Sequence, residues 1–128
     1  MGQSPPSRPL SPHLQVWRWH ITMATSIAHR ASGVAMYVGS LVIAGWLLAA
    51  ARGQTPYERF EALLLSPLGR VVLFAFTLAA TYHLANGLRH LVWDLGYGFE
   101  PRRADRSGLF VFGFSGVATV VIWLLAYA

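Results

Sequence analysis

Three long apolar runs dominate the hydrophobic pattern of this chain. They lie at residues 31–51, 71–88 and 108–128, and each is long enough, with its flanks, to cross a hydrocarbon layer of about 30 Å as a helix. We therefore predict an all-α integral membrane protein with three transmembrane helices at about residues 25–51, 67–95 and 107–128. Together these helices form a transmembrane domain over residues 25–128.

The segments outside the apolar runs are polar and contain most of the prolines and arginines. Residues 1–24 are predicted to form a tail, extended in its Pro- and Ser-rich part and interfacial around its tryptophans, because indole rings favour the headgroup level. Residues 52–65 contain glycine, proline and several charges, which favours an exposed loop. The second connection is expected to carry Arg102, Arg103 and Arg106 before the third helix begins.

Composition and charge support a small membrane protein. The chain is 55% hydrophobic and 12% charged, which is too apolar for an ordinary soluble domain of this length. It has no cysteine, so it holds no iron-sulfur cluster by itself. The net charge is +5, yet the arginines are scattered at helix ends, so nucleic-acid binding is not expected. Their excess on the side of the tail and the second connection places the N-terminus in the cytoplasm.

A polar stripe runs along the second predicted helix. His83, Gly87, His90 and Asp94 follow the three-and-four spacing of one helical face. An imidazole in an apolar run is costly and usually functional, and a glycine one turn later leaves a groove for a flat macrocycle, so the stripe suits a haem. A structural alternative for His83 stays open, in which it donates to a carbonyl of a neighbouring helix. His90 is either an interfacial residue or, with Arg89, neutralises a haem propionate.

A second polar cluster stands at the start of the first predicted helix. Ser26, His29 and Arg30 lie within two turns, and Ser26 and Arg30 are four apart, so they share a face. Such a set supplies hydrogen bonds and protons to a carbonyl-bearing ring such as a quinone. The simpler alternative is that Ser26 caps the helix and Arg30 anchors it among phosphates. If the first two helices are antiparallel, this cluster lies at the same membrane face as His90.

Three motifs occur in order over residues 8 to about 98. They are Arg8-Pro9-Leu10-Ser11-Pro12-His13-Leu14, then Ser26-Ile27-x-His29-Arg30-x-Ser32-Gly33, then His83-x-x-x-Gly87-x-Arg89-His90-Leu91-x-Trp93-Asp94. Together they resemble the cytochrome b membrane-anchor subunit of succinate dehydrogenase, respiratory complex II. The third helix matches that family only in its hydrophobicity.

The resemblance implies half of a heterodimeric membrane-anchor bundle. In that family a second anchor subunit shares one haem b with this one, and both form the ubiquinone site under the iron-sulfur subunit. His83 is then the axial ligand of the haem iron, and the partner anchor supplies the second ligand. The chain lacks cysteine and a Gly-rich dinucleotide fingerprint, which agrees with flavin and clusters held by other chains, the flavoprotein and iron-sulfur subunits.

The resemblance also implies roles for the first cluster. Ser26, Ile27 and Arg30 line the quinone site, with Ile27 packed against the quinone ring. His29, Arg30 and His90 lie near the haem propionates. The corresponding location is the bacterial inner membrane, or the mitochondrial inner membrane in a eukaryote.

These observations predict an electron-transfer subunit of succinate:quinone oxidoreductase, with succinate oxidation on partner chains. Two alternative functions remain open: a haem-free structural anchor, and the anchor of a menaquinone-linked fumarate reductase. A transporter or channel subunit is disfavoured, because residues 108–128 contain no charged side chain and offer no polar path.

Overall fold

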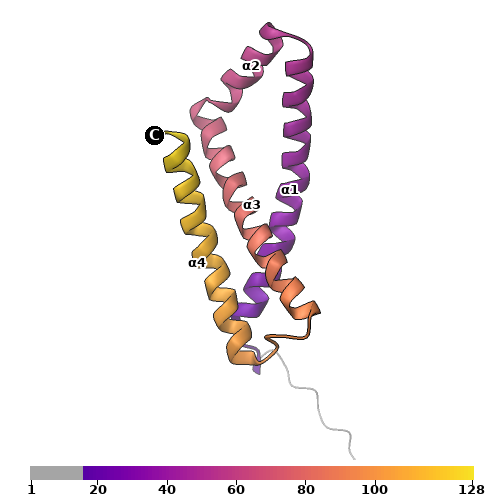
Figure 1. Ribbon diagram of the computed structural model, residues 1–128, viewed down its shortest axis with the longest axis vertical. Coiled ribbons are helices and arrows are strands. Elements are labelled where there is room, and N and C mark those ends of the chain that lie inside the picture. Colours follow the sequence, from indigo (N-terminus) through magenta and orange to yellow (C-terminus); the bar gives the residue numbers. More distant parts are fainter. Residues whose placement is uncertain (1–15) are drawn as a thin grey trace, which may run out of the picture.

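The computed structural model describes residues 16–128, so the predicted extended part of the tail and the motif at residues 8–14 lie outside the described residues. Within this range the chain is helical and has no strand. The helices are α1 (Ile21–Ala51), α2 (Gln54–Leu64), α3 (Pro67–Asp94) and α4 (Pro101–Ala126) (Figure 1). Three of them, α1, α3 and α4, are long and apolar enough to cross a membrane, which confirms the predicted fold.

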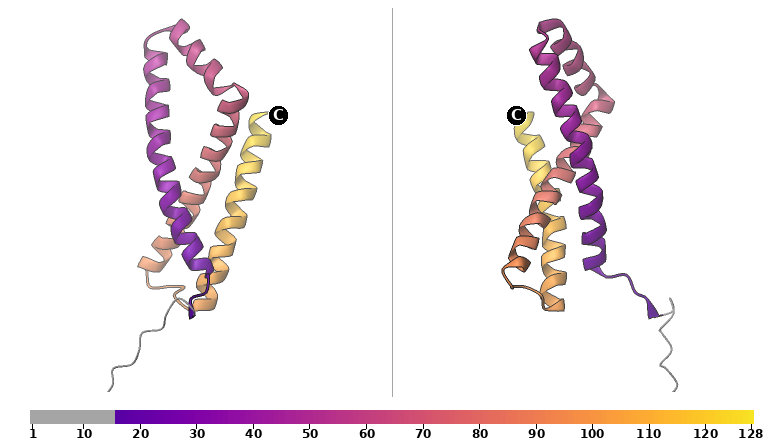
Figure 2. Two further views of the ribbon diagram at one scale, coloured as in Figure 1. Left: turned by 180° about the vertical axis from the view of Figure 1, so that it is seen from behind. Right: turned by 90° about the vertical axis from the view of Figure 1, so that its right-hand side faces the viewer.

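The three long helices converge at one end of the molecule. α3 and α4 run side by side, while α1 crosses α3 near the N-terminal end of α1 and then diverges from it (Figures 1 and 2). At the opposite end of the molecule, α2 connects the C-terminal end of α1 to the N-terminal end of α3, where these two helices lie far apart. Between these three helices is an apolar cavity of about 700 Å³. The converging end is therefore where residues from different helices meet.

The predicted loop at residues 52–65 is wrong, because most of it forms α2. Two hydrogen bonds between side chains four residues apart support this helix: Gln54 Nε2 donates to Glu58 Oε1 (2.7 Å), and the Tyr57 hydroxyl donates to Glu61 Oε1 (3.1 Å). The proline of this segment falls in the first turn of the helix, where its missing N–H costs little.

Two helices begin earlier than predicted. α1 begins at Ile21 rather than near residue 25, and α4 begins at Pro101 rather than near residue 107. The three arginines expected in the second connection therefore lie on the first turns of α4. The physical reason is that Pro101 has a backbone angle suited to the first helical position, and Arg103 Nε pairs with Glu100 Oε2 at 2.9 Å one turn away.

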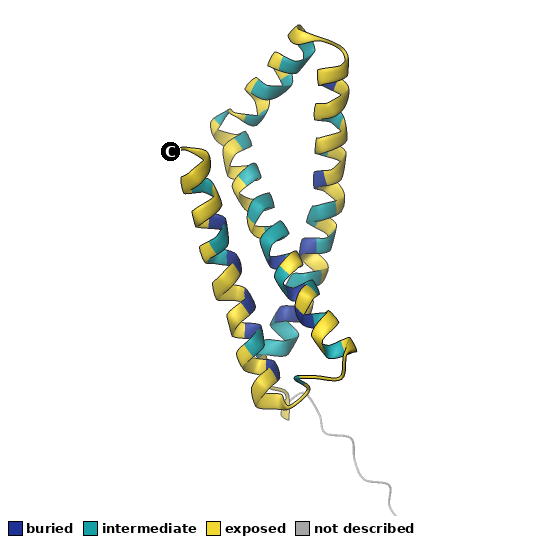
Figure 3. Cartoon of the chain, in the orientation of Figure 1, coloured by how far each residue is buried: buried dark blue, intermediate teal, exposed yellow. Residues whose placement is uncertain are grey.

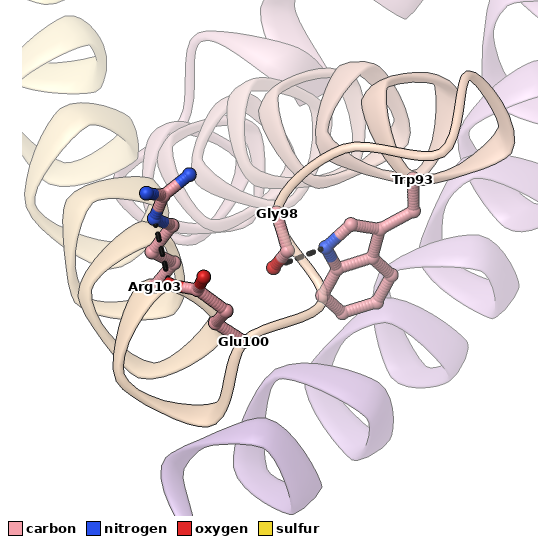
Figure 4. Close-up of polar contacts among 4 residues, drawn as sticks. All are labelled: Trp93, Gly98, Glu100 and Arg103. Atoms are coloured by element: carbon pink, nitrogen blue, oxygen red, sulfur yellow. Dashed lines mark hydrogen bonds and ion pairs between the residues drawn. The ribbon is translucent and has the colours of Figure 1, made fainter.

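Side chains and glycines shape the connection between α3 and α4. Figure 4 shows the indole of Trp93 pointing at the Gly98 carbonyl, to which its Nε1 donates at 3.3 Å, and the Glu100–Arg103 ion pair beside it. Gly96 and Gly98 have φ angles of +88° and +83°, a region that side chains rarely adopt. This tight connection places the first turns of α4 against the last turns of α3.

The interior of the bundle is more polar than its exterior. Most large hydrophobic side chains are exposed, and the buried residues form a stripe on the facing sides of the helices (Figure 3). The buried polar residues are Thr25, Ser32, Asn86, Arg89, Ser115 and Thr119, and the buried hydrophobic ones are Ala49, Tyr82, Ala104 and Val111. This distribution is typical of helices in lipid, where small and polar residues mediate packing.

Hydroxyl groups join α3 to α4 along their length. Thr81 Oγ1 lies 2.9 Å from Thr119 Oγ1, and Trp123 Nε1 donates to Thr77 Oγ1 at 3.2 Å. Between α1 and α3 a close steric approach accompanies hydrogen bonds at the converging end, since a Cβ atom at Gly39 would overlap the ring of Phe76. These contacts fix how α1 and α4 sit on α3.

Candidate functional site

Three histidines from two helices stack at the converging end of the bundle. The ring centroid of His29, on α1, lies 4.1 Å from that of His83 and 5.1 Å from that of His90, both on α3. The ring planes differ by only 12° and 19°. The two clusters predicted from separate parts of the sequence thus meet, as the antiparallel arrangement requires.

The His83 imidazole lies against a polar and sterically small part of α1. Its Nδ1 lies 3.0 Å from Ser32 Oγ, and the Ser32 hydroxyl also donates to the His29 carbonyl at 2.8 Å. A Cβ atom at Gly33 would lie 3.4 Å from His83 Cε1. The partner of His83 is therefore a hydroxyl group and not the backbone carbonyl that one reading of the sequence proposed.

The other two imidazoles differ in their hydrogen bonding. His90 Nδ1 lies 2.7 Å from the Asn86 carbonyl, one turn back on α3. His29 Nδ1 is buried, and no hydrogen-bond partner for it exists among residues 16–128. A buried polar atom without a partner is unfavourable, so this atom marks a position that a bound group with an acceptor or donor would stabilise.

The space and the donors beside His83 fit a haem. A Cβ atom at Gly87, one turn beyond His83, would meet no atom within 4 Å, so this face of α3 is open to a flat ring. Within residues 16–128 no three side chains of the metal-binding types converge on one point. One imidazole is enough to provide an axial ligand to a haem iron, and the unpartnered Nδ1 of His29 lies in the same stack.

The predicted quinone residues lie next to this stack on α1. Ser26, Ile27 and Arg30 are exposed in this chain, whereas His29 on the same two turns is partly buried. The reading of Ser26 as the helix cap is wrong, because α1 begins at Ile21 and its N-cap is His20. A hydroxyl group, an apolar side chain and a guanidinium are thus presented together at the end of the bundle where the histidines meet.

Arg89 occupies the centre of the converging end. Its donors reach three helices: Nε donates to Ser107 Oγ (2.8 Å), Nη1 to Thr25 Oγ1 and Asn86 Oδ1 (3.2 Å each), and Nη2 to the Ala104 carbonyl (2.9 Å). The guanidinium also lies 4.0 Å from the centroid of the Trp93 ring. Arg89 is 7% exposed. Its hydrogen bonds are therefore largely made inside the chain, which assigns it to holding the helices together.

Sequence reasoning gave no role to three residues that the structure places at the site. Ser32 and Thr25 supply acceptors to His83 and Arg89, and the Tyr82 hydroxyl donates to the Thr25 carbonyl at 2.8 Å. The available signal for Ser32 was its position one turn after His29 in an apolar run. No comparable pattern pointed to Thr25 or Tyr82, whose partners are far apart in the sequence.

Comparison with known proteins agrees with the resemblance in the motifs. The family model described as succinate dehydrogenase/fumarate reductase transmembrane subunit matches residues 4–122. The chain is 37% identical to the succinate dehydrogenase cytochrome b556 subunit of Paracoccus denitrificans over 121 residues, which cover 94% of this chain and 93% of that protein. It is 34% identical to the cytochrome b556 subunit of Rickettsia typhi over 117 residues, 91% of each chain.

A mitochondrial relative shows the same likeness over a shorter part of its length. The chain is 39% identical to the succinate dehydrogenase cytochrome b560 subunit of Homo sapiens over 107 residues, which cover 82% of this chain and 63% of that protein. The chain therefore belongs to the family of succinate dehydrogenase and fumarate reductase transmembrane subunits, and its relatives there are cytochrome b subunits of succinate dehydrogenase.

Proposed function

We propose that this membrane subunit of succinate dehydrogenase binds haem b together with a second membrane-anchor subunit and helps to form the site where ubiquinone is reduced. Electrons reach this site from succinate through the flavoprotein and iron-sulfur subunits. The observation that carries the proposal is the His83 imidazole, hydrogen-bonded through Nδ1 and next to an open face of α3. The names of the relatives, which are cytochromes b, point the same way.

The haem contacts follow from the three imidazoles. His83 would bind the iron through Nε2, because its Nδ1 is engaged with Ser32. His29 and His90 stack beside it, and with Arg30 they are suited to the carboxylates of the haem. When bound, haem b supplies one-electron transfer, while the chain supplies the ligand and a polar surrounding for the propionates.

The quinone contacts follow from the exposed side chains of α1. The Arg30 guanidinium would polarise a carbonyl oxygen of the ring, and the Ser26 hydroxyl would donate a hydrogen bond to it. Ile27, which is 51% exposed, offers an apolar surface to the flat ring. Since all three side chains face outward, the partner subunits would complete the pocket.

The distribution of arginines supports an orientation with the converging end at the cytoplasmic face. Six arginines lie toward that end and three toward the opposite end: Arg18, Arg30, Arg89, Arg102, Arg103 and Arg106 against Arg52, Arg59 and Arg70. An excess of arginine on one side is typical of the cytoplasmic side. The N-terminus would then face the cytoplasm, where the soluble subunits of the enzyme dock.

An optical spectrum of the purified complex tests the haem. The chain is co-expressed with its partner subunits, and the dithionite-reduced minus oxidised difference spectrum is expected to show haem b at one per complex. The alternative of a haem-free anchor predicts no such band. A fully assembled complex without haem would therefore overturn the proposal.

Replacement of Ser26 or Arg30 with alanine tests the quinone site. We expect ubiquinone reduction by succinate to fall by about 100-fold, the effect of removing one preorganised donor to a reacting oxygen. Succinate oxidation by an artificial soluble acceptor is expected to persist, because the flavin and clusters lie on other chains. Ser40→Ala and Arg102→Ala, at exposed positions elsewhere, serve as controls. Equal loss of both activities would contradict the assignment and indicate an assembly role.

A further inference from the structure

We propose that Ser32 is the positioning residue of His83. Its hydroxyl oxygen accepts a hydrogen bond from Nδ1–H of the imidazole. This bond holds the ring in the one tautomer and orientation that leave Nε2 free for iron. This inference deepens the proposed function and rests on it. Three observations carry it: the protons available in the contact, the burial of Ser32, and the contacts of the His83 ring.

Counting protons fixes the direction of the hydrogen bond. A serine hydroxyl has one proton to donate, and a carbonyl oxygen can only accept. Ser32 Oγ lies 2.8 Å from the His29 carbonyl and 3.0 Å from His83 Nδ1. Since the hydroxyl proton goes to the carbonyl, Nδ1 must donate to Oγ. In the tautomer that carries this Nδ1 proton, the lone pair of the ring is on Nε2, which is the atom left to bind a metal.

Because Ser32 is buried, water cannot easily take the place of its hydroxyl as the acceptor for His83. Ser32 is 6% exposed, so little solvent reaches the position of its hydroxyl to take over as the acceptor. The helix fixes the hydroxyl, because the bond to the His29 carbonyl is made within α1, one turn back. The acceptor for His83 is therefore built into α1 before any haem binds.

The ring of His83 is constrained on other sides as well. His29 stacks on one face at 4.1 Å between centroids, and the backbone of α1 at Gly33 lies beside Cε1, where a Cβ atom would be in van der Waals contact at 3.4 Å. With Nδ1 bonded to Ser32, rotation of the ring would break the hydrogen bond and disturb the stack. A partner to the second nitrogen of a ligating histidine commonly orients the ligand and raises its basicity, and a more basic ligand stabilises the oxidised iron.

The test is Ser32→Ala in the complete complex, measured by redox titration of haem b and by the rate of haem transfer to an apo-globin acceptor. We expect an assembled complex whose haem midpoint potential is more positive than that of the wild type. Haem affinity is expected to be weaker by about 10- to 100-fold, as for other partners of metal-binding histidines. Ser32→Thr, which keeps the hydroxyl, is expected to restore the potential.

Ser40→Ala is the matched control. Ser40 lies on the same helix and donates in the same way, to the Tyr37 carbonyl at 2.7 Å, but it is exposed and has no histidine partner. The haem midpoint potential of the Ser40→Ala complex is expected to equal that of the wild type. A Ser32→Ala complex with wild-type potential and haem retention would overturn the proposal, as would loss of assembly in both the alanine and the threonine variants, which indicates a packing role. If the wild type holds no haem, the proposed function itself fails.

Discussion

Replacement of His83 with leucine is expected to remove the sharp reduced band of a six-coordinate haem b. The imidazole is the iron ligand that this chain offers in the proposed site, and leucine has no lone pair to replace it. Leucine suits the middle of a membrane helix, so α3 should still insert. The measurement is a reduced-minus-oxidised spectrum of membranes that contain the assembled complex, normalised to succinate oxidation with an artificial acceptor.

His20→Leu is the control for this substitution. His20 is exposed, and its side chain makes no capping hydrogen bond at the start of α1, so its loss should leave the spectrum unchanged. His90→Leu is expected to keep the band, since His90 is proposed to face the propionates and not the iron. An unchanged spectrum and midpoint potential in an assembled His83→Leu complex would refute iron ligation by this residue.

Arg89→Met is expected to give the largest loss of stability among single substitutions in this chain. The guanidinium joins α1, α3 and α4 through four hydrogen bonds. Asn86 is fully buried, and its Nδ2 has no partner among residues 16–128, so methionine would leave its Oδ1 unpaired as well. Hydrogen bonds from a charged group contribute about 1.5–3 kcal/mol each and are not additive. We expect a loss of about 3 kcal/mol, seen as a lower melting temperature and less assembled complex.

Arg103→Met separates this effect from the loss of any arginine at the same end. Arg103 pairs with Glu100 on the surface, with about 70% of each side chain exposed, and such pairs contribute only about 0–1 kcal/mol. Arg89→Lys should fall between the two, because an ammonium keeps the charge but not the planar fork of donors. A melting temperature for Arg89→Met equal to that of Arg103→Met would show that the hydrogen bonds of Arg89 do not hold the helices together.

The fold was largely predictable because the membrane requires long apolar helices, and these are visible as runs in the sequence. α2 was not predictable, because the glycine, proline and charged residues of this segment favour a loop. The side-chain hydrogen bonds that support the helix form only once the helix exists. The early start of α4 does not follow from the sequence for a related reason, since three arginines in a polar segment favour a connection over a helix. Charge signals the membrane boundary, but it does not mark where a helix ends.

The site was predictable in its residue types but not in its contacts. The polar stripe of α3 and the cluster on α1 were identified because ionisable groups in apolar runs are rare. That His29 inserts beside His83 could be inferred only from the stacked rings, and the link to Ser32 depends on how closely α1 approaches at Gly33. The inward direction of Arg89 is likewise a result of packing, because its acceptors lie on three helices.

The position of the acceptors of Arg89 has a consequence for how the chain is made. Two of the four, on Ser107 and Ala104, belong to α4, which leaves the ribosome after α3. Until α4 enters the bilayer, this guanidinium lacks half of its partners and remains hydrated at the headgroup level. α3 therefore settles to its final depth only after α4 arrives, which makes insertion of the last helix the step that closes the bundle.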